Sequence, residues 1–129
     1  MTDGLSPDAT RAAVARYFEG TRSMNAAQWA AAFAPTAIVE DPVGQPPLTT
    51  PQAILAQGEA FVTAFSQAGL QETFVEVNGN EAVAYWIGRG IQPDGSRVRF
   101  EGINHFQFDT DGKVTKLRGF WNPQNIRPE

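Results

Sequence analysis

Three turn motifs divide the second half of the sequence into segments of similar length, and they constrain the fold more than any other feature. The motifs are Asn78-Gly79-Asn80, Pro93-Asp94-Gly95 and Asp109-Thr110-Asp111-Gly112. Glycine, asparagine and aspartate readily adopt the backbone conformations of tight hairpin turns. The segments between them alternate apolar and polar side chains, as half-buried strands do. The sequence therefore predicts an antiparallel meander with strands near residues 71–78, 82–91, 97–108 and 114–122.

The first half of the chain carries the signals of helices. Ser6-Pro7 and Thr50-Pro51 each place a capping side chain directly before a proline. Proline is favoured at the first helical position, because its fixed backbone angle suits the helix and its missing N–H would have no partner there. These motifs predict one helix over residues 6–20 and another over residues 50–66.

A shorter helix and a strand are expected between these two helices. The helix should begin near Asn25, carry Trp29 and Phe33 inward and end at Pro35, since proline cannot continue a helix. Residues 37–41, Ala-Ile-Val-Glu-Asp, should then form a short strand, and another proline follows it. A residue before proline favours extended backbone, so the strand should fray at that aspartate.

Helices followed by a strand meander are typical of an α+β domain. We expect a cone-shaped, curved antiparallel sheet wrapped around three helices of the N-terminal half, with a cavity inside. The chain of 129 residues fits a single domain over positions 1–129, with enough length for one core and a modest pocket. Gly88 and Gly90 lie on one face of a predicted strand, where glycine marks either bending of the strand or space left open for a ligand, with a β-bulge as the alternative.

The composition excludes several classes of function. Ten Lys and Arg against fourteen Asp and Glu give a formal net charge of −4, so neither nucleic acid nor a membrane is an expected partner. The chain has no cysteine and one histidine, which argues against disulfides, thiolate metal sites and multi-histidine metal sites. We therefore expect no bound metal. The chain shows no membrane-spanning stretch and no secretion signal, so the expected location is the cytoplasm.

Strand alternation separates two polar candidates in the third predicted strand. His105 falls on the face shared with charged residues, so it should point away from the cavity, toward solvent or a partner subunit. Asn104 falls on the opposite face, between Phe100 and Phe106. Burying an amide without a partner costs about 1–3 kcal/mol, so Asn104 should bond to a neighbouring backbone group or donate to a ligand. Tyr17, on the apolar face of the first helix, poses the same question for a hydroxyl.

Two adjacent acids end the short strand of the first half. Because side chains alternate along a strand, only one of Glu40 and Asp41 can enter the cavity. The residues before them, Ile38 and Val39, are both apolar, so the pattern leaves the choice open. A carboxylate in an apolar cavity would have a raised pKa and could carry a proton. The alternative is that both acids lie in solvent.

Four segments resemble the bacterial ketosteroid isomerases, in the right order along nearly the whole chain. They are Ala15-Arg-Tyr-Phe-Glu19, Val39-Glu-Asp-Pro-Val-Gly-Gln-Pro-Pro47, Ile103-Asn-His-Phe-Gln-Phe108 and Phe120-Trp-Asn-Pro-Gln-Asn-Ile126. The stretch from Glu40 to Pro47 is the most specific. The hairpin that follows Phe106 suits a wider superfamily related to nuclear transport factor 2, which also contains polyketide cyclases, epoxide hydrolases and non-catalytic binding domains. The resemblance implies the cone-shaped, cystatin-like α+β barrel of that superfamily.

The resemblance also implies a cofactor-independent reaction, in which a β,γ-double bond of a 3-ketosteroid or similar ketone moves into conjugation through a dienolate. In the family, an aspartate transfers the proton, while a tyrosine and a protonated aspartic acid stabilise the oxyanion. By position, Asp41 is the implied general base and Tyr17 an implied oxyanion donor. Asn104 stands where the family has the acid; an amide is a weaker donor, but it donates at any pH.

Six aromatic side chains are implied as the lining for a flat apolar substrate: Phe33, Phe61, Trp86, Phe100, Phe106 and Trp121. Phe33 and Gly58 stand where the family has tyrosines that support the catalytic one, so Tyr17 should lack that hydrogen-bonded chain and Gly58 should enlarge the pocket or loosen its helix. A homodimer formed through the exposed sheet face is also implied. Two alternatives remain: a polyketide cyclase-like enzyme of the same fold, or a non-catalytic domain that binds a small apolar ligand.

Overall fold

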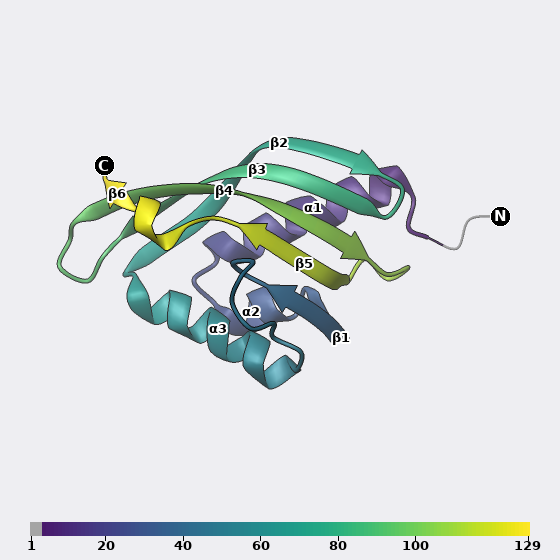
Figure 1. The fold of residues 1–129 in the computed structure, drawn as a ribbon, viewed down its shortest axis with the longest axis horizontal. Helices are drawn as coiled ribbons and strands as arrows, with labels where there is room; N and C mark the ends of the chain where they lie inside the picture. Colours follow the sequence, from purple (N-terminus) through teal and green to yellow (C-terminus); the bar gives the residue numbers. More distant parts are fainter. Residues whose placement is uncertain (1–3) are drawn as a thin grey trace.

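A six-stranded sheet curves over three helices in the computed structural model of the protein, which describes residues 4–129 (Figure 1). The helices are α1 (Pro7–Arg22), α2 (Ala26–Ala30) and α3 (Pro51–Ala64). The strands are β1 (Phe33–Glu40), β2 (Gln67–Asn78), β3 (Glu81–Ile91), β4 (Arg97–Phe108), β5 (Val114–Phe120) and β6 (Arg127–Pro128), and a 3-10 turn, η1 (Pro123–Asn125), precedes the last. This is the α+β architecture that the order of helix and strand signals predicts.

The two proline-led caps act as predicted. The side chain of Ser6 accepts a hydrogen bond from the backbone of Ala9, and that of Thr50 accepts one from Ala53. Each cap gives a partner to an N–H group that the first turn of a helix leaves unpaired. The helices end within two residues of their predicted limits, at positions 22 and 64. Among residues 4–129, no helix is long and apolar enough to cross a membrane.

The prediction for Phe33 and Pro35 is wrong. Helix α2 ends at Ala30, and both residues belong to β1. This strand lies at the end of the strand order, next to β5, so it is an edge strand, and its register with β5 shifts between Phe33 and Ile38. Proline is tolerated at an edge and at such an irregularity, because no ladder hydrogen bond from its nitrogen is needed there. Phe33 still points inward, but from the sheet rather than from a helix.

The predicted meander is present. The sheet differs from the prediction in that one strand pairs parallel with its neighbour and a further short strand is added. Strands β2 to β5 pair antiparallel in sequence order, whereas β1 pairs parallel with β5, so the sheet is mixed. The C-terminal segment, for which no element was predicted, forms η1 and then β6, which pairs with β4. Strand β2 also begins earlier than predicted, at Gln67. The hairpin glycines Gly79, Gly95 and Gly112 have positive φ angles, as these turns require.

The two strand glycines mark neither an open space for a ligand nor a β-bulge. A Cβ atom on Gly88 would lie 2.5 Å from the ring of Phe100, and one on Gly90 would lie 2.5 Å from the ring of Phe65. The register of β3 with β4 is unbroken across both positions, so they form no bulge. Aromatic rings, rather than a ligand, occupy the space that these glycines leave.

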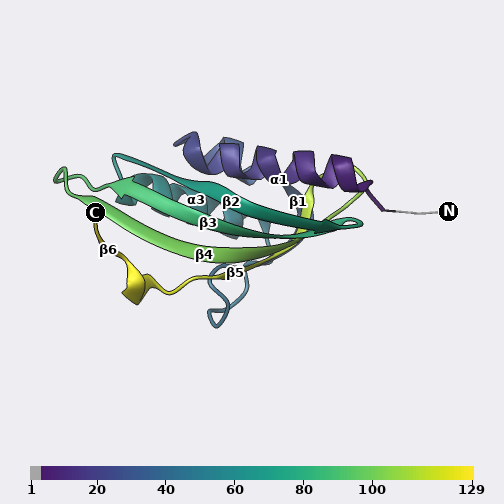
Figure 2. The ribbon, with the colours of Figure 1, turned by 90° about the horizontal axis from the view of Figure 1, so that it is seen from above.

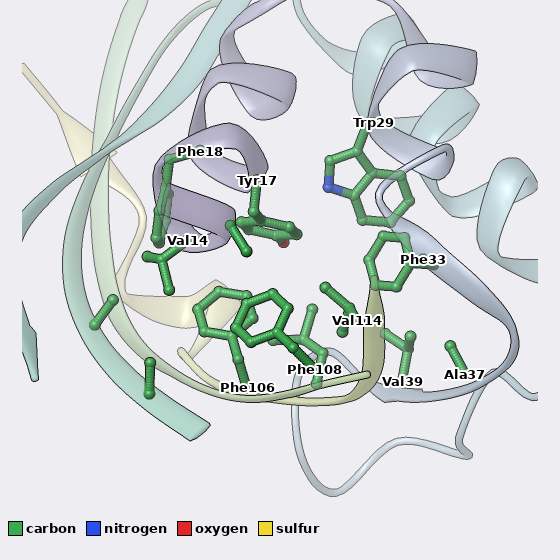
Figure 3. Packing of buried hydrophobic residues seen from close by; sticks show 14 of the residues in the cluster. Val14, Tyr17, Phe18, Trp29, Phe33, Ala37, Val39, Phe106, Phe108 and Val114 are labelled. Atoms are coloured by element: carbon green, nitrogen blue, oxygen red, sulfur yellow. The ribbon is translucent and has the colours of Figure 1, made fainter. Parts of the chain in front are cut away.

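The hydrophobic core lies between α1 and the concave face of the sheet. Figure 2 shows α1 running along the sheet next to β2 and β3. Alternate residues of β4 are buried along its whole length, and its apolar side chains pack against Val14, Tyr17 and Phe18 of α1. Figure 3 shows this closely packed part of the interior. Beyond it, where α2 and α3 cover the sheet, the interior opens into a cavity.

Candidate active site

The cavity has a volume of about 760 Å³, which is in the range of small-molecule sites. Its walls are mainly apolar and include Leu48, Phe61, Phe65, Trp86, Phe100 and Trp121. Its polar lining residues include the three candidates, which come from separate parts of the chain: Tyr17 belongs to α1, Asp41 directly follows β1, and Asn104 belongs to β4. The structure therefore brings together the three residues named as candidates for chemistry.

The aromatic lining differs from the prediction at two positions. Phe61, Trp86, Phe100 and Trp121 line the cavity, but Phe33 and Phe106 do not. These two rings lie in the packed interior on either side of Tyr17, with ring centroids 6.0 Å and 4.9 Å from that of Tyr17 (Figure 3). The helices and the sheet converge at this end, so the side chains meet each other instead of an open space. Both rings hold Tyr17 in place.

Asp41 is the acid that enters the cavity. The indole nitrogen of Trp121 donates a hydrogen bond to its Oδ1 at 2.6 Å. Part of the side chain is accessible from the cavity, but protein atoms surround it closely, and this burial raises the pKa of Asp41 to about 6 although the Trp121 bond lowers it. A carboxylate with this pKa can take up and release a proton near neutral pH. Glu40 points to the opposite face and pairs with Arg118, at 3.1 Å between Oε1 and Nε.

Backbone contacts fix the position of Asp41. The segment after it folds back, and Val39 and Leu48 exchange two backbone hydrogen bonds of 2.9 and 2.8 Å. The backbone N–H of Val43 also donates to the carbonyl of Gly119 in β5, at 2.8 Å. A Cβ atom on Gly119 would lie 2.5 Å from Oδ1 of Asp41, so only glycine leaves room for the carboxylate. These contacts show how the segment from Glu40 to Pro47 holds the carboxylate of Asp41 in place.

Tyr17 is a hydrogen-bond donor under all ordinary conditions. Its side chain is 2% exposed. Burial, and then the negative charge of Asp41, raise the pKa of Tyr17 far above its ordinary value, while hydrogen bonds from Trp29 and Asn104 oppose the rise. The hydroxyl therefore stays protonated. Trp29 and Asn104, as donors beside this hydroxyl, would also stabilise negative charge near it.

Trp29 is a neighbour of Tyr17 that the sequence predicted only as an inward-facing apolar residue. The two ring centroids are 6.5 Å apart, and the indole nitrogen lies on the side that faces Tyr17 (Figure 3). A Cβ atom on Gly58 would lie 2.9 Å from Cε3 of Trp29. Gly58 thus makes room for the indole, and it also lines the cavity. The glycine inside a predicted helix was the available signal, because it marks a close approach by another group.

Asn104 has a partner, as its burial requires. The residue is 1% exposed, and its Oδ1 accepts a hydrogen bond of 3.0 Å from the indole nitrogen of Trp86. The partner is a side chain two strand positions away across the sheet, rather than the backbone group considered from the sequence. The amide nitrogen is left to donate. His105, the next residue, faces outward as predicted, with its Nε2 2.8 Å from Oε1 of Glu81.

The three polar groups have complementary chemistry. Asp41 can accept a proton, whereas the hydroxyl of Tyr17 and the amide of Asn104 can donate to an oxygen that gains negative charge. Apolar walls exclude water, which strengthens such interactions. The arrangement suits removal of a proton from a carbon next to a carbonyl group. Among the residues that the structure describes, no three His, Asp or Glu side chains gather as metal ligands would.

Comparison with known proteins gives a consistent picture. A family model described as SnoaL-like domain matches residues 14–117. A curated protein named Steroid Delta-isomerase, from Nocardioides simplex, is 33% identical over 117 residues, which cover 90% of this chain and 92% of that protein.

Two solved structures share the fold at low sequence identity. One is the epoxide hydrolase/cyclase-like enzyme SalBIII, described as acting in pyran ring formation in the polyether salinomycin; its TM-score is 0.84 at 20% identity, over 95% of this chain and 97% of that one. The other is RV0760c from Mycobacterium tuberculosis, with a TM-score of 0.82 at 15% identity, over 96% of this chain and 98% of that one.

Proposed function

The chain belongs to the SnoaL-like domain family, within the superfamily related to nuclear transport factor 2, and on this basis we propose that it is a cofactor-independent ketosteroid isomerase. The proposed reaction moves a β,γ-double bond into conjugation with the carbonyl group of a 3-ketosteroid or a similarly flat ketone. The observation that carries the proposal is the meeting of Asp41, Tyr17 and Asn104 in one apolar cavity. The similarity to the Nocardioides simplex enzyme supports the choice of substrate class.

The reaction needs one proton carrier and one site for negative charge. Asp41 takes a proton from the carbon between the carbonyl group and the double bond, and the C–H electron pair moves into a dienolate. The hydroxyl of Tyr17 and the amide of Asn104 donate to the dienolate oxygen. Asp41 then returns the proton to the far end of the former double bond. The carboxylate is regenerated, and substrate and product have the same composition.

The environment of Asp41 supports its role as the base. With a pKa of about 6, the carboxylate is mostly ionised at pH 7, yet it holds a proton more tightly than an exposed aspartate does. A base whose pKa lies close to the working pH balances these two needs. The rate should therefore fall as the pH drops below about 6, because the protonated carboxyl group cannot accept the substrate proton.

A β,γ-unsaturated 3-ketosteroid tests the proposal directly. Turnover creates a conjugated enone, whose ultraviolet absorbance rises with time. Asp41→Asn should abolish the rise, whereas Glu40→Gln, which removes the neighbouring acid outside the cavity, should leave it nearly unchanged. Saturable binding of a phenolic steroid without any turnover would contradict the isomerase proposal and favour a binding domain or a polyketide cyclase-like enzyme.

We also propose that the convex face of the sheet binds a second copy of the chain. Phe74, Tyr85, Ile103 and Phe120 lie opposite one another on β2, β3, β4 and β5 and form an apolar row. Three of them are about half exposed, at 58%, 48% and 46% for the residues on β2, β4 and β5. Such a row can pair with itself about a two-fold axis. Ile103→Lys should then give a monomer in sedimentation equilibrium, and a wild-type monomer would contradict the proposal.

A further inference from the structure

Two indole groups each hold one polar side chain of the site. Trp121 donates to Asp41, and Trp86 donates to Asn104 at 3.0 Å. Both members of the second pair are almost completely buried, with 2% and 1% exposure. Trp86 lies at the cavity wall, and the mechanism above assigns it no part beyond lining.

The chemistry of the indole determines which end of the amide faces it. An indole N–H can only donate, whereas an asparagine side chain has one accepting end and one donating end. Because Trp86 occupies the accepting end, the NH₂ group of Asn104 is directed elsewhere. Asn104 also opposes the rise in the pKa of Tyr17, and both side chains line the same cavity. The two ends of the amide are similar in size. If Trp86 were absent, little would oppose a half-turn of the amide that presents its oxygen to the substrate.

Glycines give this hydrogen bond its room. A Cβ atom on Gly102 would lie 2.6 Å from Cζ2 of Trp86, so the indole could not lie across β4 if this residue had a side chain. Gly119 is paired with Asn104, and a Cβ atom there would lie 3.2 Å from the amide oxygen. A side chain at position 102 would thus displace the indole, and one at position 119 would press against the amide oxygen. The arrangement is built into the sheet rather than being a chance contact.

We propose that Trp86 is a positioning residue that fixes the orientation of the Asn104 amide and so makes asparagine a dependable donor to the substrate oxygen. This inference rests on the proposed isomerase function, in which an amide stands where the family has a protonated acid. Trp86 acts through Asn104. A protonated acid donates through its own proton and does not need its orientation fixed in this way, whereas the Asn104 amide does.

The inference predicts that the effect of Trp86 reverses when residue 104 is an acid. In Asn104→Asp, the indole N–H would donate to the carboxylate and favour its ionised form, which cannot donate to the substrate oxygen. Removing the N–H in that background favours the protonated, donating form. Trp86→Phe should therefore lower kcat in the Asn104 protein and raise it in Asn104→Asp. A residue that only packs against the substrate would lower kcat in both.

The experiment is a double-mutant cycle of Trp86→Phe and Asn104→Asp. In the Asn104 background we expect kcat to fall about tenfold with KM nearly unchanged, less than the roughly 10²–10³-fold loss on removing a donor outright. In the Asn104→Asp background we expect kcat to rise. Phe100→Leu is the matched control, because its ring contacts Trp86 at a centroid distance of 5.9 Å without any hydrogen bond. It should lower kcat by the same factor in both backgrounds, and the same behaviour from Trp86→Phe would refute the inference.

Two additions keep the test decisive. If Trp86→Phe does not fold, the sulfur isostere 3-benzothienylalanine at position 86 keeps the shape of the indole and removes only the N–H. Binding of 4-nitrophenol gives a readout that needs no turnover, since the visible absorbance of the bound probe reports the fraction ionised. This fraction should fall on loss of the N–H in the Asn104 protein and rise in Asn104→Asp. A reversal seen with the probe but no steroid turnover would overturn the proposed function and leave the role of Trp86 standing.

Discussion

Replacing Trp121 by phenylalanine should raise the pKa of Asp41 and move the acid limb of the pH–rate profile toward neutral pH. The indole N–H donates to Oδ1 of Asp41 at 2.6 Å and favours the ionised carboxylate. Phenylalanine keeps an aromatic ring at the cavity wall but has no such donor. Burial, which already raises the pKa, then acts without this opposition.

The magnitude follows from the strength of the lost bond. A hydrogen bond to a charged group contributes about 1.5–3 kcal/mol, and one pKa unit corresponds to about 1.36 kcal/mol. The pKa of Asp41 should therefore rise by roughly one to two units, from about 6 to between about 7 and 8. At pH 7 the ionised fraction falls from roughly nine-tenths to between roughly one-tenth and one-half.

The assay is the dependence of kcat/KM on pH, which reports the ionisation of the free enzyme. Near pH 6 the Trp121→Phe variant should be roughly 5- to 50-fold slower than the wild type, and near pH 9 the two should be nearly equal. Phe61→Leu, a change to the wall away from the carboxylate, should leave the acid limb in place. If Trp121→Phe loses the same factor at every pH, the indole acts by packing alone and the reasoning is refuted.

Three further predictions concern stability and the surroundings of the site. Asp41→Asn should stabilise the protein by up to about 3 kcal/mol at pH 7, because folding raises the pKa of Asp41 from 3.8 to about 6 and so opposes ionisation; in urea unfolding the gain should fall to roughly 0.5 kcal/mol at pH 4 and vanish at lower pH, where the unfolded chain is protonated as well. Gly119→Ala should lower kcat roughly 10- to 100-fold by displacing the carboxylate of Asp41, with a near-normal circular dichroism spectrum; unchanged kcat would count against the close fit. His105→Gln, which breaks the exposed pair with Glu81, should leave turnover unchanged and shift the free energy of unfolding by less than about 1 kcal/mol.

The features predicted correctly from the sequence are those that local chemistry determines. The proline-led caps at Ser6 and Thr50 and the glycine-containing turns act within a few residues, so they mark helices and hairpins wherever the rest of the chain lies. Alternation along β4 correctly separates His105 from Asn104 for the same reason. The choice between Glu40 and Asp41 could not be made this way. It depends on how the end of β1 is anchored to β5.

The features that were missed depend on partners distant in the sequence. Pro35 stops no helix, because β5 supplies an edge that accepts it, and nothing near residue 35 announces this. The glycines show the same limitation. Gly58 makes room for Trp29 and Gly88 for Phe100, and each ring comes from another element. The sequence therefore identifies positions where a side chain is excluded, whereas only the structure shows what excludes it.

Because β1 pairs parallel with β5, the active site can form only when the sheet is nearly complete. Strands β2 to β5 can assemble through successive hairpins, whereas β1 must wait until β5 exists. Asp41 and Trp121 are 80 positions apart, and they meet because parallel strands end at the same edge. Contacts over such a separation close late, since a long loop must first be ordered. In a refolding experiment, turnover should therefore appear only after most of the β-sheet signal has returned.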